Sequence, residues 1–133
     1  MKTLIFASHN KNKAIEIRAL LPKGLELKTL NDINLEEEIP ETGTTLEENA
    51  LLKAQFIYRN FGEACFADDT GLEVKALDGQ PGVFSARYAG LQKSSEDNMT
   101  KLLNELKSKE NRKARFRTVI AYINKKGEEF LFD

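Results

Sequence analysis

The sequence predicts an α/β protein built on a mixed β-sheet with flanking helices. Short apolar runs typical of buried strands alternate along the chain with longer segments that repeat apolar residues at helical spacing. Near the end of the chain, residues 116–123 and 129–132 form two strand-like runs around the turn residues Lys125-Lys126-Gly127. This hairpin predicts antiparallel pairs beside the parallel ones that strand-helix-strand units produce.

The first elements are predicted to be a strand, a turn and a helix. Residues 3–8 form a short apolar run, and the apolar positions of residues 14–21 keep a helical spacing that Pro22 and Gly24 end. Residues 25–30, LELKTL, predict a second strand. The acidic run 36–38 then leads into IPETGTT, which is typical of an irregular loop.

A second helix is expected after Thr45. Thr45 and Glu48 form a capping box, in which the hydroxyl accepts from a first-turn N–H group and the glutamate reaches back. Apolar residues then keep a helical spacing until Gly62, which ends the helix. The remaining expectations are strands ACFAD and LEVKAL around an acid pair, a turn at Asp78-Gly79, a loop over 80–90 and a helix over 96–106.

Composition limits the function classes. A chain of 133 residues with 41% hydrophobic content is long enough for one core and too short for two comfortable domains. Its 20 basic and 21 acidic residues give a net charge of -1, which argues against nucleic-acid wrapping and membrane steering. Cys65 has no partner for an internal disulfide, and the first apolar run is too short for a secretory signal, so a cytoplasmic location is expected.

Adjacent acids, Asp68 and Asp69, follow a short apolar strand. Burial penalises carboxylates unless a cation, a donor cluster or water meets them. Glu41 adds another oxygen ligand, and Mg²⁺ uses few protein oxygens when phosphates supply the rest. Zinc is disfavoured because Cys and His lack a suitable spacing. The alternative is a solvated acidic loop over residues 36–41, with Asp69-Thr70-Gly71 only a turn.

The segment SHNKNK, residues 8–13, lies between the first strand and the first helix. Ser8 and Asn10 can donate hydrogen bonds, Lys11 and Lys13 bring charge, and the helix start presents free N–H groups, which together suit a phosphate. It is not a P-loop, since no glycine lies nearby. Capping of the helix alone is the alternative. The single histidine, His9, has no paired nucleophile and is more typical of an exposed loop residue.

Four segments in order resemble signatures of the inosine/xanthosine triphosphate pyrophosphatase family: residues 8–13, 40–50, 67–72 and 81–88. The resemblance covers essentially the whole chain from Thr3 to Asp133. It implies Mg²⁺-dependent hydrolysis of deaminated purine nucleoside triphosphates (ITP, dITP, XTP) to the monophosphate and pyrophosphate, as nucleotide-pool sanitation, usually in a homodimer. It also implies a two-lobed pyrophosphatase fold around a nucleotide cleft, with residues 1–133 as a single, incomplete domain.

The same resemblance implies roles for individual residues. Glu41 and Asp69 resemble the family's metal ligands. Asp69 also resembles the family's catalytic residue, which orients water, and Asp68 resembles the acid that precedes that residue. Ser85 and Arg87 also match, although Arg87 alternatively pairs with an acid to hold its loop. The expected substrate-binding residues are Ser8, His9, Asn10, Lys11, Asn12, Lys13, Lys53 and Thr70.

Family members continue through an aromatic-glycine segment and a later Ser-His-Arg that build much of the base pocket, and this sequence has neither. The chain thus resembles a member truncated before its C-terminal third. We expect phosphate and metal binding to be encoded, with base discrimination and turnover impaired. A final strand in an incomplete sheet also invites pairing with a second copy.

Two alternatives to an active enzyme remain open. In the first, the chain is a fragment that binds a nucleotide without hydrolysing it. In the second, it is an RNA-binding module that uses the basic run 107–117, although the near-neutral overall charge favours a solvated helix end and loop for that run.

Overall fold

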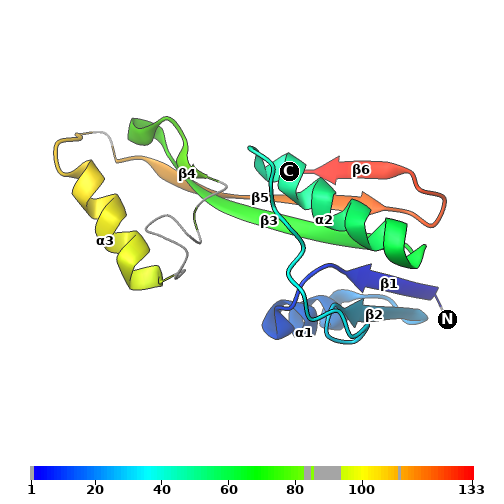
Figure 1. Ribbon diagram of the computed structural model, residues 1–133. Coiled ribbons are helices and arrows are strands. Elements are labelled where there is room, and N and C mark those ends of the chain that lie inside the picture. Colours follow the sequence, from blue (N-terminus) through cyan, green and yellow to red (C-terminus); the bar gives the residue numbers. More distant parts are fainter. Residues whose placement is uncertain (1, 83–84, 86–93, 111) are drawn as a thin grey trace.

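The computed structural model describes residues 2–82, 85, 94–110 and 112–133, and Arg87 lies outside them (Figure 1). A short 3-10 helix spans Lys75–Leu77. The helices are α1 (Lys11–Leu20), α2 (Leu46–Phe61) and α3 (Ser95–Leu106). The strands are β1 (Lys2–Phe6), β2 (Leu25–Thr29), β3 (Cys65–Val74), β4 (Gln80–Gly82), β5 (Ala114–Ile123) and β6 (Glu129–Phe132).

The sheet is mixed, as predicted. Within the described residues its strand order is β2-β1-β3-β5-β6, with β4 paired to β3 outside this path. β1 pairs in parallel with β2 and with β3, because the connections through α1 and α2 return the chain to the same end of the sheet. The pairs β3–β4, β3–β5 and β5–β6 are antiparallel, and the last is the predicted hairpin.

β3 corrects one prediction. The sequence predicts two strands around the acid pair, but Cys65–Val74 is one continuous strand. Its register against β5 is unbroken from Cys65 opposite Ile123 to Val74 opposite Ala114. The alternative that Asp69-Thr70-Gly71 is only a turn is therefore wrong. Alternate residues of β3 turn their backbone groups toward β5, while Asp68, two residues after Phe66, turns its own toward the β1 side of the sheet.

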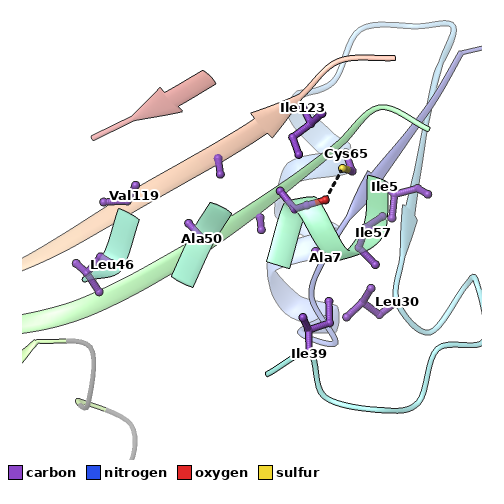
Figure 2. Close-up of a cluster of buried hydrophobic side chains, with 13 residues drawn as sticks. Ile5, Ala7, Leu30, Ile39, Leu46, Ala50, Ile57, Cys65, Val119 and Ile123 are labelled. Atoms are coloured by element: carbon purple, nitrogen blue, oxygen red, sulfur yellow. Dashed lines mark hydrogen bonds between the residues drawn. The ribbon is translucent and has the colours of Figure 1, made fainter. Parts of the chain in front are cut away.

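Each face of the sheet is covered by a different helix. The core on the α2 face contains Ala54, Ile57, Cys65 and Ala67, and the Cys65 thiol donates to the Ala54 carbonyl at 3.2 Å (Figure 2). On the α1 face, Phe66 stacks on Phe6 with ring centroids 4.7 Å apart, against Ala14 and Leu27. Since side chains alternate along a strand, Asp68 belongs to the α1 face and Asp69 to the α2 face.

The start of α2 is fastened to the loop before it. The Thr45 hydroxyl accepts from the Glu48 N–H at 3.1 Å, as a capping box predicts. The Glu48 carboxylate, however, accepts from the Thr44 N–H at 2.8 Å, one residue earlier than expected. Gly62 ends the helix with a φ of 66°, a conformation that glycine adopts at little cost.

The long β3–β5 ladder joins two ends of the molecule (Figure 1). Helices α1 and α2 lie at one end with β1 and β2, while α3 lies at the other end near β4. Apolar side chains on the β5–β6 hairpin are exposed, among them Ile120, Phe130 and Phe132. None of the helices in the described ranges has the length and apolar character that crossing a bilayer requires.

Candidate functional site

The sheet has a gap where β1 ends and β3 continues. The Ala7 N–H donates to the Phe66 carbonyl at 2.9 Å, and the chain then turns away into α1. Asp68 and Asp69 follow directly on β3, beyond the paired part of β1. In open α/β sheets, ligands bind outside the carboxyl ends of strands at such divergence points. The acid pair therefore lies where this fold offers a binding crevice.

The turn before α1 presents a lysine to this gap. The Asn10 side chain accepts from the Lys13 N–H at 3.0 Å, and Ser8 Oγ accepts from the Asn10 N–H at 3.0 Å. This capping places Lys13 Nζ 2.7 Å from the Asp68 carboxylate, on the α1 face. Asp68 is 16% exposed and Lys13 is 44% exposed, so the ion pair is open to solvent on the lysine side.

A second lysine reaches the gap from α2. Lys53 Nζ lies 3.1 Å from a Glu41 carboxylate oxygen and donates to the Asp68 carbonyl at 2.5 Å. That carbonyl is two residues after the Phe66 carbonyl and points to the same side, where β1 no longer supplies a donor. Lys53 thus links the loop that carries Glu41 to the strand that carries the acid pair.

Asp69 occupies an unfavourable position for a charge. Burial raises its pKa from the ordinary 3.8 to about 6, and the negative charges of Glu41 and Asp68 act in the same direction, while the Lys53 charge and the Asn49 amide act in the opposite one. Its Oδ2 is buried and has no hydrogen-bond partner among the described residues. Such an oxygen is available to a cation or a water molecule.

The carboxylates fit a divalent cation only if other oxygens complete its surroundings. Within the described ranges, no group of three or more His, Cys, Asp and Glu side chains is placed to hold a metal. Glu41 and Asp69 nevertheless interact through their charges, and Asp69 Oδ2 has no hydrogen-bond partner in the described part of the chain. Mg²⁺ commonly takes one or two protein carboxylates plus phosphate and water oxygens. The donor set therefore suits Mg²⁺ held jointly with a phosphate.

A hollow of about 410 Å³ lies beside these groups. Ser8, His9, Glu41 and Lys53 contribute to its lining. The His9 ring does not stand free: its Nε2 lies 2.7 Å from the Leu35 carbonyl and fastens the loop that forms one wall. The sequence does not predict this contact, because it joins the turn to a distant part of the chain.

The other predicted residues are more peripheral. Lys11 and Asn12 are exposed in the first turn of α1. The Thr70 hydroxyl shares a 2.8 Å hydrogen bond with Thr118 on β5. Ser85 Oγ donates to the Gly82 carbonyl at 2.6 Å and accepts from the Leu72 N–H, so it joins β3 to the residues after β4.

Asn49, to which the sequence motifs assign no role, lies beside the site. It is fully buried on α2, and its side-chain oxygen accepts from the Gly43 N–H at 2.7 Å. A signal for it exists in the sequence: a polar residue stands between apolar positions such as Leu46 and Ala50, on the side of the helix that faces the core.

The fold and the site define an α/β protein with a charged crevice at the end of a parallel strand. Residues 4–133 match the Ham1 family, and the chain belongs to this family. The resemblance predicted from four segments of the sequence is thereby confirmed.

Similar proteins support the assignment. A dITP/XTP pyrophosphatase of Flavobacterium johnsoniae is 54% identical over 129 residues, which cover 97% of this chain and 67% of that protein. One of Bacillus subtilis is 47% identical over 132 residues, 97% of this chain and 66% of that protein. The structure of the Staphylococcus aureus Ham1 protein matches with a TM-score of 0.92 and 38% identity, over 98% of this chain and 68% of that one. The chain spans about two thirds of the length of these relatives.

Proposed function

We propose that this chain hydrolyses deaminated purine nucleoside triphosphates, such as ITP, dITP and XTP, to the monophosphate and pyrophosphate, as nucleotide-pool sanitation. Relatives named dITP/XTP pyrophosphatases support the reaction class. The observation that carries the proposal is the meeting of Lys13, Lys53, Glu41 and Asp69 around one gap in the sheet. Positive and negative groups so close together suit a polyphosphate with a divalent cation.

Both lysines are paired with acidic residues in the structure. Lys13 contacts Asp68, and Lys53 contacts Glu41. We propose that triphosphate oxygens replace these carboxylates as partners of the ammonium groups, with the N-terminal turn of α1 adding N–H donors. Glu41 is then released to act together with Asp69. Other proposed contacts of the substrate are Ser8, His9, Asn10, Lys11, Asn12 and Thr70.

Glu41 and Asp69 would hold Mg²⁺. When bound, Mg²⁺ supplies polarisation of phosphorus and offsets charge on the phosphate oxygens. Asp69 orients a water for attack on the α-phosphorus. Its pKa is raised to about 6 in the metal-free protein, and a bound cation would lower it and hold the carboxylate ionised. Lys13 and Lys53 offset the oxygen charge that develops as pyrophosphate leaves.

The chain spans about two thirds of its relatives' length, so hydrolysis of the triphosphate by these 133 residues is a proposal. Selection of a 6-oxo purine requires a donor at that oxygen, since a 6-amino group would leave the donor unpaired. A second candidate function is Mg²⁺-dependent binding of the nucleotide without its hydrolysis.

We further propose a cytoplasmic homodimer that forms one domain per chain and binds a small-molecule triphosphate rather than nucleic acid or a membrane. Two arginines of the basic run support the choice against nucleic acid. Arg115 contacts Glu73 at 2.8 Å, and Arg117 contacts Glu47 and Asp133. These carboxylates offset the charge that phosphate recognition would require.

One assay tests the proposed function. Pyrophosphate release is measured from ITP, XTP and ATP with Mg²⁺, for the unmodified chain and for Asp69→Asn. We expect release from ITP and XTP in preference to ATP, and a loss of about 100-fold or more in the variant. Equal rates in both proteins would remove Asp69 from the mechanism. Mg²⁺-dependent binding of ITP without release would select the binding function, and absence of both would contradict the proposal.

A further inference from the structure

Asn49 is a fully buried polar residue that the proposed reaction does not use. It lies four positions before Lys53 on α2, so both side chains leave the same face of the helix. Lys53 connects Glu41 to β3 through two polar contacts. The surroundings of Asn49 indicate a second connection between the Glu41 loop and β3, one helical turn before Lys53.

One side of Asn49 holds the loop that carries Glu41. Its Oδ1 accepts from the Gly43 N–H at 2.7 Å. The loop approaches α2 so closely that a Cβ at Gly43 would lie 2.6 Å from Glu48 Cβ and 2.7 Å from Asn49 Oδ1. Only glycine permits this approach, and Glu41 is two residues away. The position of the Glu41 backbone is therefore tied to the Asn49 amide.

The other side of Asn49 faces Asp69. Asn49 is buried on the side of α2 that packs on β3, and the Asp69 side chain lies on the same face of the sheet as Ala67, toward this helix. The Asn49 amide also acts to lower the pKa of the Asp69 carboxyl. Asn49 Nδ2 and Asp69 Oδ2 are both buried, and neither has a hydrogen-bond partner among the described residues. One of these atoms is a donor and the other an acceptor, so each can satisfy the other.

We propose that Asn49 is a positioning residue that sets the separation between the Glu41 and Asp69 carboxylates and thereby tunes the affinity for a divalent cation. This inference rests on the metal site of the proposed function. A neutral amide suits the task because its oxygen accepts from the Gly43 N–H and its Nδ2 can donate to Asp69, without adding a charge that competes for either carboxylate. An apolar residue there would leave the Gly43 N–H unpaired.

Metal binding without nucleotide tests the inference directly. Mn²⁺ is titrated into the unmodified chain, into Asn49→Ala and into Asn60→Ala, with free Mn²⁺ followed by electron paramagnetic resonance. Asn60 is a matched control, since it is an exposed amide on the same helix that donates to the Phe56 carbonyl. We expect Asn49→Ala to weaken Mn²⁺ binding about 10-fold or more, as loss of a partner of a metal ligand does, and Asn60→Ala to leave it unchanged.

The outcomes separate this inference from the proposed function. Binding of Mn²⁺ by the unmodified chain with equal affinity in Asn49→Ala would overturn the inference alone. If the unmodified chain binds no Mn²⁺ in this titration, it is repeated with a non-hydrolysable ITP analogue, which supplies phosphate oxygens. No binding by the unmodified chain under either condition would overturn the metal site and the inference together. Hydrogen exchange adds a readout without metal: the Gly43 amide should exchange faster in Asn49→Ala, and unchanged protection would contradict the proposed connection.

A merely structural role predicts a different result in the activity assay. If the variant only lost folded protein, its rate would fall at every Mg²⁺ concentration. We expect instead that the half-saturating Mg²⁺ concentration rises, while the KM for ITP at saturating Mg²⁺ changes less than about 2-fold. An unchanged half-saturating concentration would overturn the inference.

Nuclear magnetic resonance of the unmodified chain gives a test that does not depend on folding of a variant. Addition of Mg²⁺ should shift the Asn49 side-chain amide and the Gly43 N–H, and leave the Asn60 side-chain amide in place. A shift of the Asp69 backbone amide without one at Asn49 would overturn the inference.

Discussion

Asp68 and Asp69 are adjacent in the chain, but their side chains lie on opposite faces of the sheet. Asp68 follows Phe66 on the α1 face and pairs with Lys13. Asp69 follows Ala67 on the α2 face, where its pKa responds to Lys53 and Glu41. The acid pair therefore serves both sides of the gap beyond β1, and Lys53 connects the sides through the Asp68 carbonyl.

Replacement of Lys13 should weaken substrate binding. In Lys13→Met the ammonium group that meets Asp68 is lost, so a triphosphate loses a charge-assisted contact and we expect the KM for ITP to rise about 10-fold or more. Lys28→Met is the control, because Lys28 forms an exposed pair with Glu26 at 3.5 Å. Pyrophosphate release against ITP concentration measures both. An unchanged KM in Lys13→Met would exclude Lys13 from the site.

Removal of the Asp69 charge should stabilise the metal-free protein. The folded-state pKa is raised to about 6, so the folded protein binds this proton more tightly than the unfolded chain does. The resulting stability is complete below pH 3.8 and is lost as the pH rises through 6. At pH 7.5 with EDTA, Asp69→Asn should gain on the order of 1 kcal/mol, less than the full shift implies because solvent screens a partly exposed group.

Urea denaturation measures this gain at two pH values. Most of the difference between Asp69→Asn and the unmodified chain should disappear at pH 4, where the folded carboxyl is protonated. A variant that is less stable than the unmodified chain at pH 7.5 would show instead that the ionised carboxylate is well compensated in the metal-free protein.

Local patterns were sufficient to predict most elements of the fold. α2 begins after Thr45 and ends at Gly62, as its capping residues indicate. The continuity of β3 was not predictable, because the local sequence Asp69-Thr70-Gly71 is typical of a turn. Pairing with β5, which comes much later in the chain, overrides that preference. The local sequence pattern carries no information about such long-range strand pairing.

The candidate site was predictable in its residue types and less so in its geometry. The acids and lysines could be identified from motifs, and their convergence follows from the gap beyond β1. The contact of His9 with the Leu35 carbonyl depends on tertiary structure alone. The opposite orientations of Asp68 and Asp69 require the knowledge that they lie within one strand.

The β5–β6 hairpin should mediate self-association. Ile120 and Phe132 lie opposite each other in the ladder and are 38% and 56% exposed. Their removal from water would stabilise a dimer, so Phe132→Lys should weaken self-association in sedimentation velocity. Leu20→Lys is the control, because Leu20 is 84% exposed on α1, away from the hairpin. Equal association of both variants would exclude the hairpin, and a monomeric unmodified chain would contradict the homodimer.

Convergence of the three segments on one cation and one polyphosphate is tested most directly by paramagnetic broadening from Mn²⁺ in the presence of a non-hydrolysable ITP analogue. We predict that backbone amides of the turn 8–13, of Glu41 and of Asp69 broaden together, because both ligands occupy the same crevice. Broadening confined to the acidic run 36–38, or to only one of the three segments, would contradict a shared site.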